Sequence, residues 1–377
     1  MAERKRKPIF IKGTYFDYPS LFMIAFLFLF GLMMVYSISS YKAGINYDDS
    51  AYFMKRQLLF GGVGFVIMLI VSRMRYQILR SWSKVIIILT TLLLLSVFVI
   101  GKSSNGSTRW ISLGILSFQP SEIAKLALII YMAYLCTDKS GYLKNLKGTI
   151  VLSLVPIFVV GVIAVENLST AIVCAVIVVA IWFVATPKPW YMIFVLIAGV
   201  VFIFAFIKLA SYRSDRITAW LDPENSPNGY QTMQALYAIG SGGLFGRGLG
   251  QSVQKMGYIP EAHNDMIFSV ICEEIGIIGG AAIIVVFALM LWRFRFIAEG
   301  APDRFGALIM VGVIAHIGFQ VFLNIAVVTN LFPNTGVTLP FISYGGSSVS
   351  FLMLEMGVVL SISRQIVPIG SMREVAE

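Results

Sequence analysis

Residues 240–276 read GSGGLFGRGLGQSVQKMGYIPEAHNDMIFSVICEEIG and join a glycine-rich, cationic loop to an apolar helix that begins at Met266. Repeated glycines permit tight turns and close approach of the backbone to a ligand. Asp265 directly precedes the apolar helix, where a carboxylate is partly dehydrated and still reachable from water. Because Asp is a preferred helix N-cap, two interpretations of Asp265 stay open: helix capping and chemistry.

Ten apolar runs are distributed along the whole sequence, before and after this junction. The chain has 377 residues, of which 58% are hydrophobic, and a membrane helix needs about 17–25 apolar residues. The runs cover residues 20–38, 57–72, 84–100, 121–136, 149–165, 168–185, 190–209, 266–291, 306–328 and 347–366. We therefore expect an all-α integral membrane protein, a single domain of residues 1–377 built as a bundle of ten transmembrane helices.

The basic residues predict how this bundle is oriented. Lys and Arg gather in the cytoplasmic loops of membrane proteins, and a cytoplasmic N-terminus puts most basic residues of the short loops on that side. Residues 1–19 then form a basic cytoplasmic N-terminus and residues 367–377 a cytoplasmic tail. Residues 210–265 form a large extracytoplasmic loop between helices seven and eight. The net charge of +10 accordingly indicates attraction to anionic lipid of the bilayer, not to nucleic acid.

Residue types argue against several other kinds of site. Cys136, Cys174 and Cys272 all fall inside predicted helices, which indicates neither a disulfide framework nor a metal site. Two histidines are too few for a histidine-based zinc site. The glycine-rich loop lacks the G-x-x-x-x-G-K-[ST] pattern and follows no predicted strand, so it is not a nucleotide-binding P-loop.

The second extracytoplasmic loop, residues 101–119, leads into a charged helix start. Pro120 suits the first turn of a helix. Glu122 and Lys125 then lie three residues apart on one helix face, at a spacing that allows an ion pair. Two interpretations stay open: a salt bridge that makes burial in the membrane tolerable, and an ionic pair that lines an outward-facing cavity.

The large loop opens with a pattern typical of an amphipathic helix. Arg213, Arg216 and Trp220 repeat at three- and four-residue spacing, so we expect a helix that lies on the outer leaflet. It is either a lipid-surface anchor or a cationic clamp for phosphate, which the forked donors of arginine suit.

The last extracytoplasmic loop, residues 330–348, is rich in proline, glycine and hydroxyl side chains. We expect it to be irregular and re-entrant, with its backbone against protein or a wet cavity. We also expect the polar loops to converge on one side of the membrane. Glu273, Glu274 and Glu355 fall inside apolar runs, where carboxylates are costly. Their role stays open between structural hydrogen bonding and a direct function.

Three stretches of the chain resemble the signature sequences of the SEDS family, the bacterial proteins of shape, elongation, division and sporulation. They are Gln119-Pro120-Ser121-Glu122, Pro260-Glu261-Ala262-His263-Asn264-Asp265 and LPFISYGGSS at residues 339–348. The resemblance covers essentially the whole chain, with the motifs in the family's order. Ala262 stands where the elongation branch usually has a basic residue, so the chain is more similar to the division and sporulation branches.

The resemblance implies a peptidoglycan glycosyltransferase that polymerises lipid II on the outer face of the bacterial cytoplasmic membrane. It implies as partners a class B penicillin-binding protein, which is a transpeptidase, and other membrane proteins of the divisome. Asp265 matches the family's essential aspartate, and Glu122 and Lys125 match residues that line its central cavity. Asn167 departs from the family, which often has an aspartate there. An amide cannot be a base, so any such role is dispensable or falls to Glu166.

Such a reaction requires a general base for the acceptor hydroxyl and positive charge for the departing pyrophosphate. We assign Asp265 as the base. The supporting cavity residues are Glu122, Lys125, Arg109 and His263. The residues expected at the substrate or its pyrophosphate are Arg213, Arg216, Gln119, Ser343 and Ser347. No organic cofactor is implied, and a divalent cation, Mg²⁺ or Mn²⁺, is an alternative source of positive charge.

Two other functions stay open. A flippase for the lipid-linked precursor would account for the intramembrane carboxylates and the broken loops. A non-catalytic scaffold of the division machinery would account for the length and the membrane content. The polar loops favour an enzyme, because they gather at one interface and not at the midplane.

Overall fold

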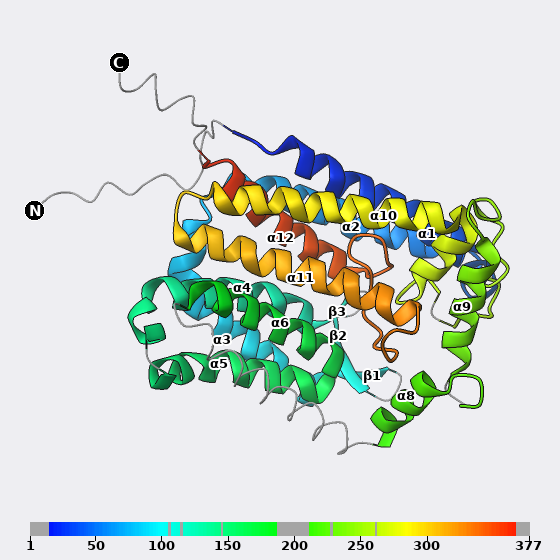
Figure 1. The fold of residues 1–377 in the computed structure, drawn as a ribbon, viewed down its shortest axis with the longest axis horizontal. Coiled ribbons are helices and arrows are strands. Elements are labelled where there is room, and N and C mark those ends of the chain that lie inside the picture. The colour runs from blue at the N-terminus through cyan, green and yellow to red at the C-terminus, as the bar shows by residue number, and fades with distance from the viewer. Residues whose placement is uncertain are drawn as a thin grey trace, which may run out of the picture.

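The computed structural model describes residues 15–104, 107–113, 116–144, 146–186, 211–226, 229–260 and 262–366. Helices dominate these ranges (Figure 1). Eight of the described helices are long and apolar enough to cross a membrane: α1 (Tyr18–Tyr47), α2 (Tyr52–Val71), α3 (Gln77–Ile100), α4 (Pro120–Asp138), α5 (Leu146–Glu166), α6 (Leu168–Ala185), α10 (Ile267–Glu299) and α11 (Arg304–Val328). The chain is thus a multi-pass α-helical membrane protein, as predicted.

The other two predicted spans are not among these eight helices. The last, 347–366, is α12 (Ser347–Ser363), an apolar helix of 17 residues. The seventh, 190–209, lies outside the described residues, so the count of ten stays a prediction. Another difference is that α1 continues to Tyr47, beyond the predicted end of the first span at residue 38.

The loop between α3 and α4 forms a small antiparallel sheet where the sequence indicated only a polar loop. Its strands are β1 (Lys102–Ser104), β2 (Ser107–Leu113) and β3 (Leu116–Phe118), in the order β1-β2-β3. β2 contains Thr108, Trp110 and Ile111, residue types that favour strands. The other described residues form no strand, so the membrane bundle itself is all-α.

Two groups of helices flank α11. In the first group α12 packs against α2, and α1 packs against α2 and α10. In the second group α4 packs against α3 and α6, and α5 packs against α6. α11 contacts α10 of the first group and α4 and α6 of the second. Figure 1 shows the first group above α11 and the second below it.

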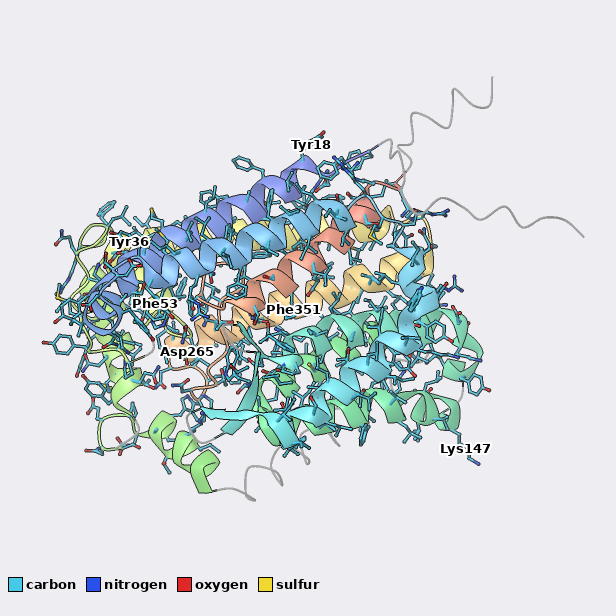
Figure 2. The ribbon with its side chains drawn as sticks, turned by 180° about the vertical axis from the view of Figure 1, so that it is seen from behind. Tyr18, Tyr36, Phe53, Lys147, Asp265 and Phe351 are labelled. Atoms are coloured by element: carbon cyan, nitrogen blue, oxygen red, sulfur yellow. The ribbon has the colours of Figure 1, made fainter. Side chains whose placement is uncertain are left out.

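The two ends of the bundle differ in their polar contacts. At one end Arg293 Nε, near the end of α10, donates to Asp17 Oδ1 at 2.7 Å, just before α1. At the same end Arg304 Nη2 donates to Ala185 O at 2.8 Å, which joins the start of α11 to the end of α6. Asp265 lies at the other end, as Figure 2 shows. We call the end with Asp265 the cavity end and the end with Asp17 the opposite end.

The long loop before α10 contains two helices at the cavity end, α8 (Ser211–Leu221) and α9 (Tyr230–Gly242). The helix predicted from the spacing of Arg216 and Trp220 is therefore present. Arg216 Nη1 donates to Asn334 O at 3.2 Å and Trp220 Nε1 to Asn330 O at 3.0 Å. Both side chains thus tie α8 to the last outer loop.

The loop between α11 and α12 enters the bundle instead of lying on its surface. Residues 329–346 contain no helix or strand, and Leu339, Phe341 and Ile342 are buried. The loop reaches α1 at Gly31, where a Cβ atom would lie 2.5 Å from Ile342 Cα. Gly31 lies about 24 Å from Tyr47, the last residue of α1, at ~1.5 Å per residue. The expected re-entrant backbone is confirmed, and it packs against protein as the bilayer requires.

The glycine-rich loop docks into a break in α10. Gly276 interrupts that helix with φ +76 and ψ 176. Backbone hydrogen bonds cross the break from both sides: Arg247 N donates to Glu273 O at 2.9 Å, and Ile277 N donates to Gly243 O at 3.0 Å. The backbone groups that the break frees are therefore satisfied by the loop. We call this joint of residues 242–248 with α10 the loop–helix junction.

Side chains strengthen the loop–helix junction. Ser252 Oγ donates to Glu273 Oε2 at 2.5 Å, and Lys255 Nζ lies 2.9 Å from Glu274 Oε1. Ser37 of α1 also donates to Glu274, at 2.8 Å. Both carboxylates are completely buried. Of the two roles left open for them, the structural one is therefore visible: they hold the outer loop against α10 and α1.

Candidate active site

A cavity of about 420 Å³ lies at the cavity end of the bundle. That volume is in the range of sites for small molecules and cofactors. The lining residues come from α2, β2, α4, α6, α11, α12 and the connecting loops. They are Arg56, Phe60, Trp110, Gln119, Glu122, Lys125, Asn167, Thr170, Val173, Asn264, Asp265, Gln320, Gly336, Val337, Thr338, Tyr344, Gly345, Gly346, Ser347 and Ser348. The cavity thus unites five of the predicted site residues: Gln119, Glu122, Lys125, Asp265 and Ser347.

Asp265 faces this cavity from just before α10. That helix begins at Ile267, its N-cap residue is Met266, and no side chain caps it. The capping interpretation of Asp265 is therefore wrong. The residue is 9% exposed, so its carboxylate is largely withdrawn from water while it still lines the cavity.

Asn324 of α11 holds the backbone around Asp265. Its amide Nδ2 donates to Asp265 O at 2.7 Å and to Val337 O at 2.8 Å. On the other side, Gly336 lies so close that a Cβ atom there would be 3.7 Å from Asp265 Oδ2. Gly336 has φ +68, a conformation that suits glycine. The re-entrant loop and α11 together therefore set the position of this carboxylate.

Glu122 and Lys125 form the ion pair that their spacing indicated. Lys125 Nζ lies 3.0 Å from Glu122 Oε1, and both residues line the cavity. Ser348 Oγ donates to the other carboxylate oxygen of Glu122 at 2.5 Å. Lys125 Nζ also donates to Gln320 Oε1 at 3.2 Å. The pair is therefore both a buried salt bridge and part of the cavity wall.

Arg56 of α2 adds a second cation to the cavity wall. Its Nη1 donates to the Tyr52 hydroxyl at 2.9 Å, and its guanidinium lies 5.6 Å from the centre of the same ring. Tyr52 in turn stacks on Tyr47 with the ring centroids 4.0 Å apart. The start of α2 thus places a charged residue at the cavity.

His263 does not line the cavity. Its ring packs against Phe53 and Tyr344, with ring centroids 4.7 and 5.6 Å apart. Burial, with a smaller effect from Lys42, lowers the pKa of His263 to about 4. The ring is therefore neutral at neutral pH, and it packs between aromatic side chains. Figure 2 shows Phe53 beside the Asp265 end of the bundle.

Ser343 also forms hydrogen bonds within the protein. Its hydroxyl accepts a hydrogen bond from Leu339 N at 2.8 Å, and its carbonyl accepts one from Gln57 Nε2 at 3.0 Å. Ser343 thus shapes the re-entrant loop beneath the cavity. Arg109 lies in β2 and Arg213 in α8, and their side chains are outside the described part of the structure.

Asn167, where the sequence departs from the SEDS pattern, has a clear structural role. Its Oδ1 accepts from Ser169 N at 3.1 Å and Thr170 N at 3.3 Å, so it caps α6. It also lines the cavity, whereas Glu166 is buried outside the lining. Asn and Asp are nearly equal as N-caps, so the departure leaves the start of α6 intact.

The comparison with known proteins matches this architecture. Residues 18–367 match the family model described as cell cycle protein, that of FtsW, RodA and SpoVE. The chain belongs to this SEDS family. The predicted similarity to the division and sporulation branches is confirmed, because the relatives include a sporulation protein and several FtsW proteins.

Three relatives of this SEDS chain illustrate the match. Stage V sporulation protein E of Bacillus subtilis is 42% identical over 340 residues, which is 89% of this chain and 93% of the relative. The probable peptidoglycan glycosyltransferase FtsW of Trichlorobacter lovleyi is 39% identical over 372 residues, 96% of both chains. A chain from a structure of a peptidoglycan synthase complex that coordinates polymerization and crosslinking has a TM-score of 0.78 at 27% identity. It covers 93% of this chain and 98% of its own.

Sequence reasoning missed the polar stripe of α11. His316, Gln320 and Asn324 recur every four residues in an otherwise apolar span, and that spacing puts side chains on one helix face. All three are buried. The recurrence was a readable signal of a polar site. Arg56 was missed because it sits beside Lys55 at a helix start, where basic residues commonly mark an interface.

Proposed function

We propose that this SEDS protein is a peptidoglycan glycosyltransferase that polymerises lipid II into glycan strands during cell division. The observation that carries the proposal is the meeting of Asp265, Lys125 and Arg56 around one cavity of an apolar bundle. A polar cavity among membrane helices suits a substrate that has a lipid tail and a sugar pyrophosphate head. The relatives named as probable peptidoglycan glycosyltransferases support the same activity.

The chemistry requires one base and local positive charge. The acceptor hydroxyl oxygen forms a bond to the anomeric carbon of the donor sugar, while the bond from that carbon to the pyrophosphate oxygen breaks. The hydroxyl proton passes to the carboxylate of Asp265. Lys125 and Arg56 stabilise the negative charge of the departing pyrophosphate. This single displacement inverts the configuration at the anomeric carbon and needs no nucleotide or covalent enzyme intermediate.

A divalent cation, Mg²⁺ or Mn²⁺, is compatible with the site. Mg²⁺ is commonly held by one or two carboxylates together with substrate phosphates, and Asp265 offers one carboxylate at the cavity. Among the residues that the structure describes, no group of three or more His, Cys, Asp or Glu side chains is placed to hold a metal ion. Asp265 would hold such a cation, which would supply positive charge for the departing pyrophosphate.

The proposal includes an orientation and partners. The cavity end faces outward from the bacterial plasma membrane, and both termini are cytoplasmic. Arg293, Arg295 and Arg304 support this orientation, because they lie at the opposite end of the bundle and basic residues favour the cytoplasmic side. The synthase complex that couples polymerization to crosslinking supports a crosslinking partner. We infer a class B penicillin-binding protein, with other divisome proteins as further partners.

The flippase alternative keeps the broken loops as support but loses the intramembrane carboxylates. Glu273 and Glu274 bind the outer loop, and Glu355 lies 2.9 Å from His316. The intramembrane carboxylates thus have structural partners. A scaffold, in turn, has no use for a cavity lined by Asp265 and two cations.

Replacing Asp265 by asparagine tests the proposed function. Asp265→Asn is nearly isosteric and caps no helix in this structure, so the protein should insert and fold. An amide cannot accept the hydroxyl proton at neutral pH, and loss of acid–base help costs about 10²–10⁴-fold in rate. We expect purified Asp265→Asn protein in detergent to lose polymerisation of lipid II to that extent.

The matched control is Asp222→Asn, the same chemical change at an exposed position of the same outer loop. It should polymerise like the wild type. Detergent removes any need to cross a membrane, so a transport defect cannot mimic the loss. A correctly folded Asp265→Asn protein with the wild-type rate would refute Asp265 as the base. A wild-type protein that never polymerises lipid II, with or without its transpeptidase, would refute the function itself.

A further inference from the structure

A chain of buried side chains runs from the cavity wall into the bundle. Lys125 Nζ donates to Gln320 Oε1 at 3.2 Å. The same oxygen lies 2.9 Å from His316 Nε2. On the far side of that ring, His316 Nδ1 lies 2.9 and 3.0 Å from the two carboxylate oxygens of Glu355. The exposed fractions of Lys125, Gln320, His316 and Glu355 are 4, 6, 2 and 2%.

The direction of each hydrogen bond follows from the chemistry of the donors. Gln320 Nε2 donates to Thr338 O at 3.0 Å, so Gln320 Oε1 faces the other two groups. Lys125 has only donors, which agrees with this orientation of the amide. His316 Nε2 must then carry a hydrogen to bond the same oxygen. The nitrogen that carries the proton is set by the partner of the other ring nitrogen, and here that partner is Glu355.

The charges of these hydrogen-bonded side chains and of Glu122 balance. His316 Nδ1 and Glu355 share one proton, so the pair is neutral in sum whichever group holds it. Lys125 is likewise neutralised by Glu122, 3.0 Å away. Ionisable groups in a membrane interior are tolerated when they pair with one another. The arrangement is therefore a closed, neutral network and not a set of isolated charges.

We propose that His316, held by Glu355, is a positioning residue that orients Lys125 through Gln320. Lysine has a flexible four-carbon stem, and Glu122 alone would leave its ammonium group free to swing about one contact. Gln320 supplies a second contact from another helix. A void of only about 20 Å³ adjoins these hydrogen-bonded side chains. It has room for about one water. Little space is left for Lys125 to move away from the cavity.

The test is a double-mutant cycle on lipid II polymerisation in detergent, and the inference rests on the proposed function. His316→Phe keeps a ring but removes the donor to Gln320. We expect His316→Phe and Lys125→Met each to lower kcat/KM by about tenfold or more, as coupled residues of one network do. In the Lys125→Met background, His316→Phe should change kcat/KM by less than about twofold. If the fold losses in kcat/KM of the two single variants multiply in the double variant, the inference is overturned.

Glu355 gives a second, independent arm. In Glu355→Gln the new amide donates to His316 Nδ1 and keeps the hydrogen of Nε2 toward Gln320, so activity should stay near the wild-type value. Glu355→Leu cannot hold the ring and should behave like His316→Phe. A role in packing alone predicts similar activity for Glu355→Gln and Glu355→Leu, because both remove the carboxylate that pairs with His316. Equal activity of Glu355→Leu and wild type would also overturn the inference.

Two controls separate the possible failures. Ser361→Ala removes another buried hydrogen bond of α12, from Ser361 Oγ to Met74 O, and should leave kcat/KM unchanged. If the wild type does not polymerise lipid II, the proposed function fails. Suppose that the wild type polymerises lipid II and Lys125→Met is impaired. If the losses in kcat/KM then multiply in the double variant, only the role of His316 fails. If His316→Phe does not fold, the Glu355 pair decides the question by itself.

Discussion

At the scale of single residues, Asn324 joins the two segments that meet at the candidate base. Its two amide hydrogens reach Asp265 O and Val337 O, one just before α10 and one in the re-entrant loop. A side chain of similar size without donors would leave two buried carbonyls without these partners. Each such loss costs about 1–3 kcal/mol. The segment that contains Asp265 and the re-entrant loop would then move away from each other.

We predict that Asn324→Leu lowers kcat for lipid II polymerisation by up to about 10²-fold, because small misplacements of reacting groups cost about that much. KM should change little, since Lys125 and Arg56 are left in place. Steady-state kinetics on detergent-purified protein would measure both constants. Thr329→Val is a suitable control, because the Thr329 hydroxyl bonds only carbonyls of its own helix. A wild-type kcat in folded Asn324→Leu protein would contradict this role.

At the scale of elements, the loop–helix junction depends on glycines in close contact. Gly246 has φ +80, and a Cβ atom there would lie 2.3 Å from Glu274 O in α10. Gly250 has nearly the same backbone conformation, φ +81, but no atom lies within 4 Å of its Cβ position. The two positions therefore separate the backbone cost of a side chain from the cost of its collision with α10.

We predict that Gly246→Ala destabilises the protein clearly more than Gly250→Ala. Both substitutions put alanine in a left-handed conformation, at about 1–2 kcal/mol, but only Gly246→Ala also forces the loop off α10. The measurement is thermal unfolding in detergent, together with the yield of monodisperse protein. Equal melting temperatures for the two variants would show that the junction tolerates separation.

The same elements show what could be predicted from the sequence. Long apolar runs located the spans, and the three-residue spacing of Glu122 and Lys125 indicated their ion pair, because both depend on local periodicity. The break at Gly276 was not predicted, since it depends on backbone contacts with residues about 30 positions away in the chain. The position of His263 between Phe53 and Tyr344 was missed for the same reason. The capping interpretation of Asp265 failed because the helix starts two residues later.

At the scale of the whole molecule, exposed residues at the two ends of the bundle allow a test of orientation. Asn225 and Leu331 lie exposed at the cavity end, and Lys139 and Gly300 lie exposed at the opposite end. The background for the test replaces the three cysteines, Cys136, Cys174 and Cys272, which are all buried and unpaired.

We predict that single cysteines at Asn225 and Leu331 react in intact cells with a thiol reagent that cannot cross membranes. Cysteines at Lys139 and Gly300 should react only after the membrane is opened, because basic flanks favour the cytoplasmic side. Labelling is read on gels of the purified protein. Protection of Asn225 with labelling of Gly300 would reverse the orientation and move the cavity to the cytoplasm.

The neutral network beneath the cavity has an electrical consequence. In the proposed orientation, water in the cavity would carry the outside solution part of the way through the bilayer, so the voltage across the membrane would fall over the shorter apolar layer below. Each elementary charge that leaked through that layer would release about 2.3 kcal/mol per 100 mV. The His316–Glu355 pair and the packed helices around it close the floor of the cavity with no net charge. The protein therefore holds a wet reaction chamber in the membrane while it keeps the membrane insulated.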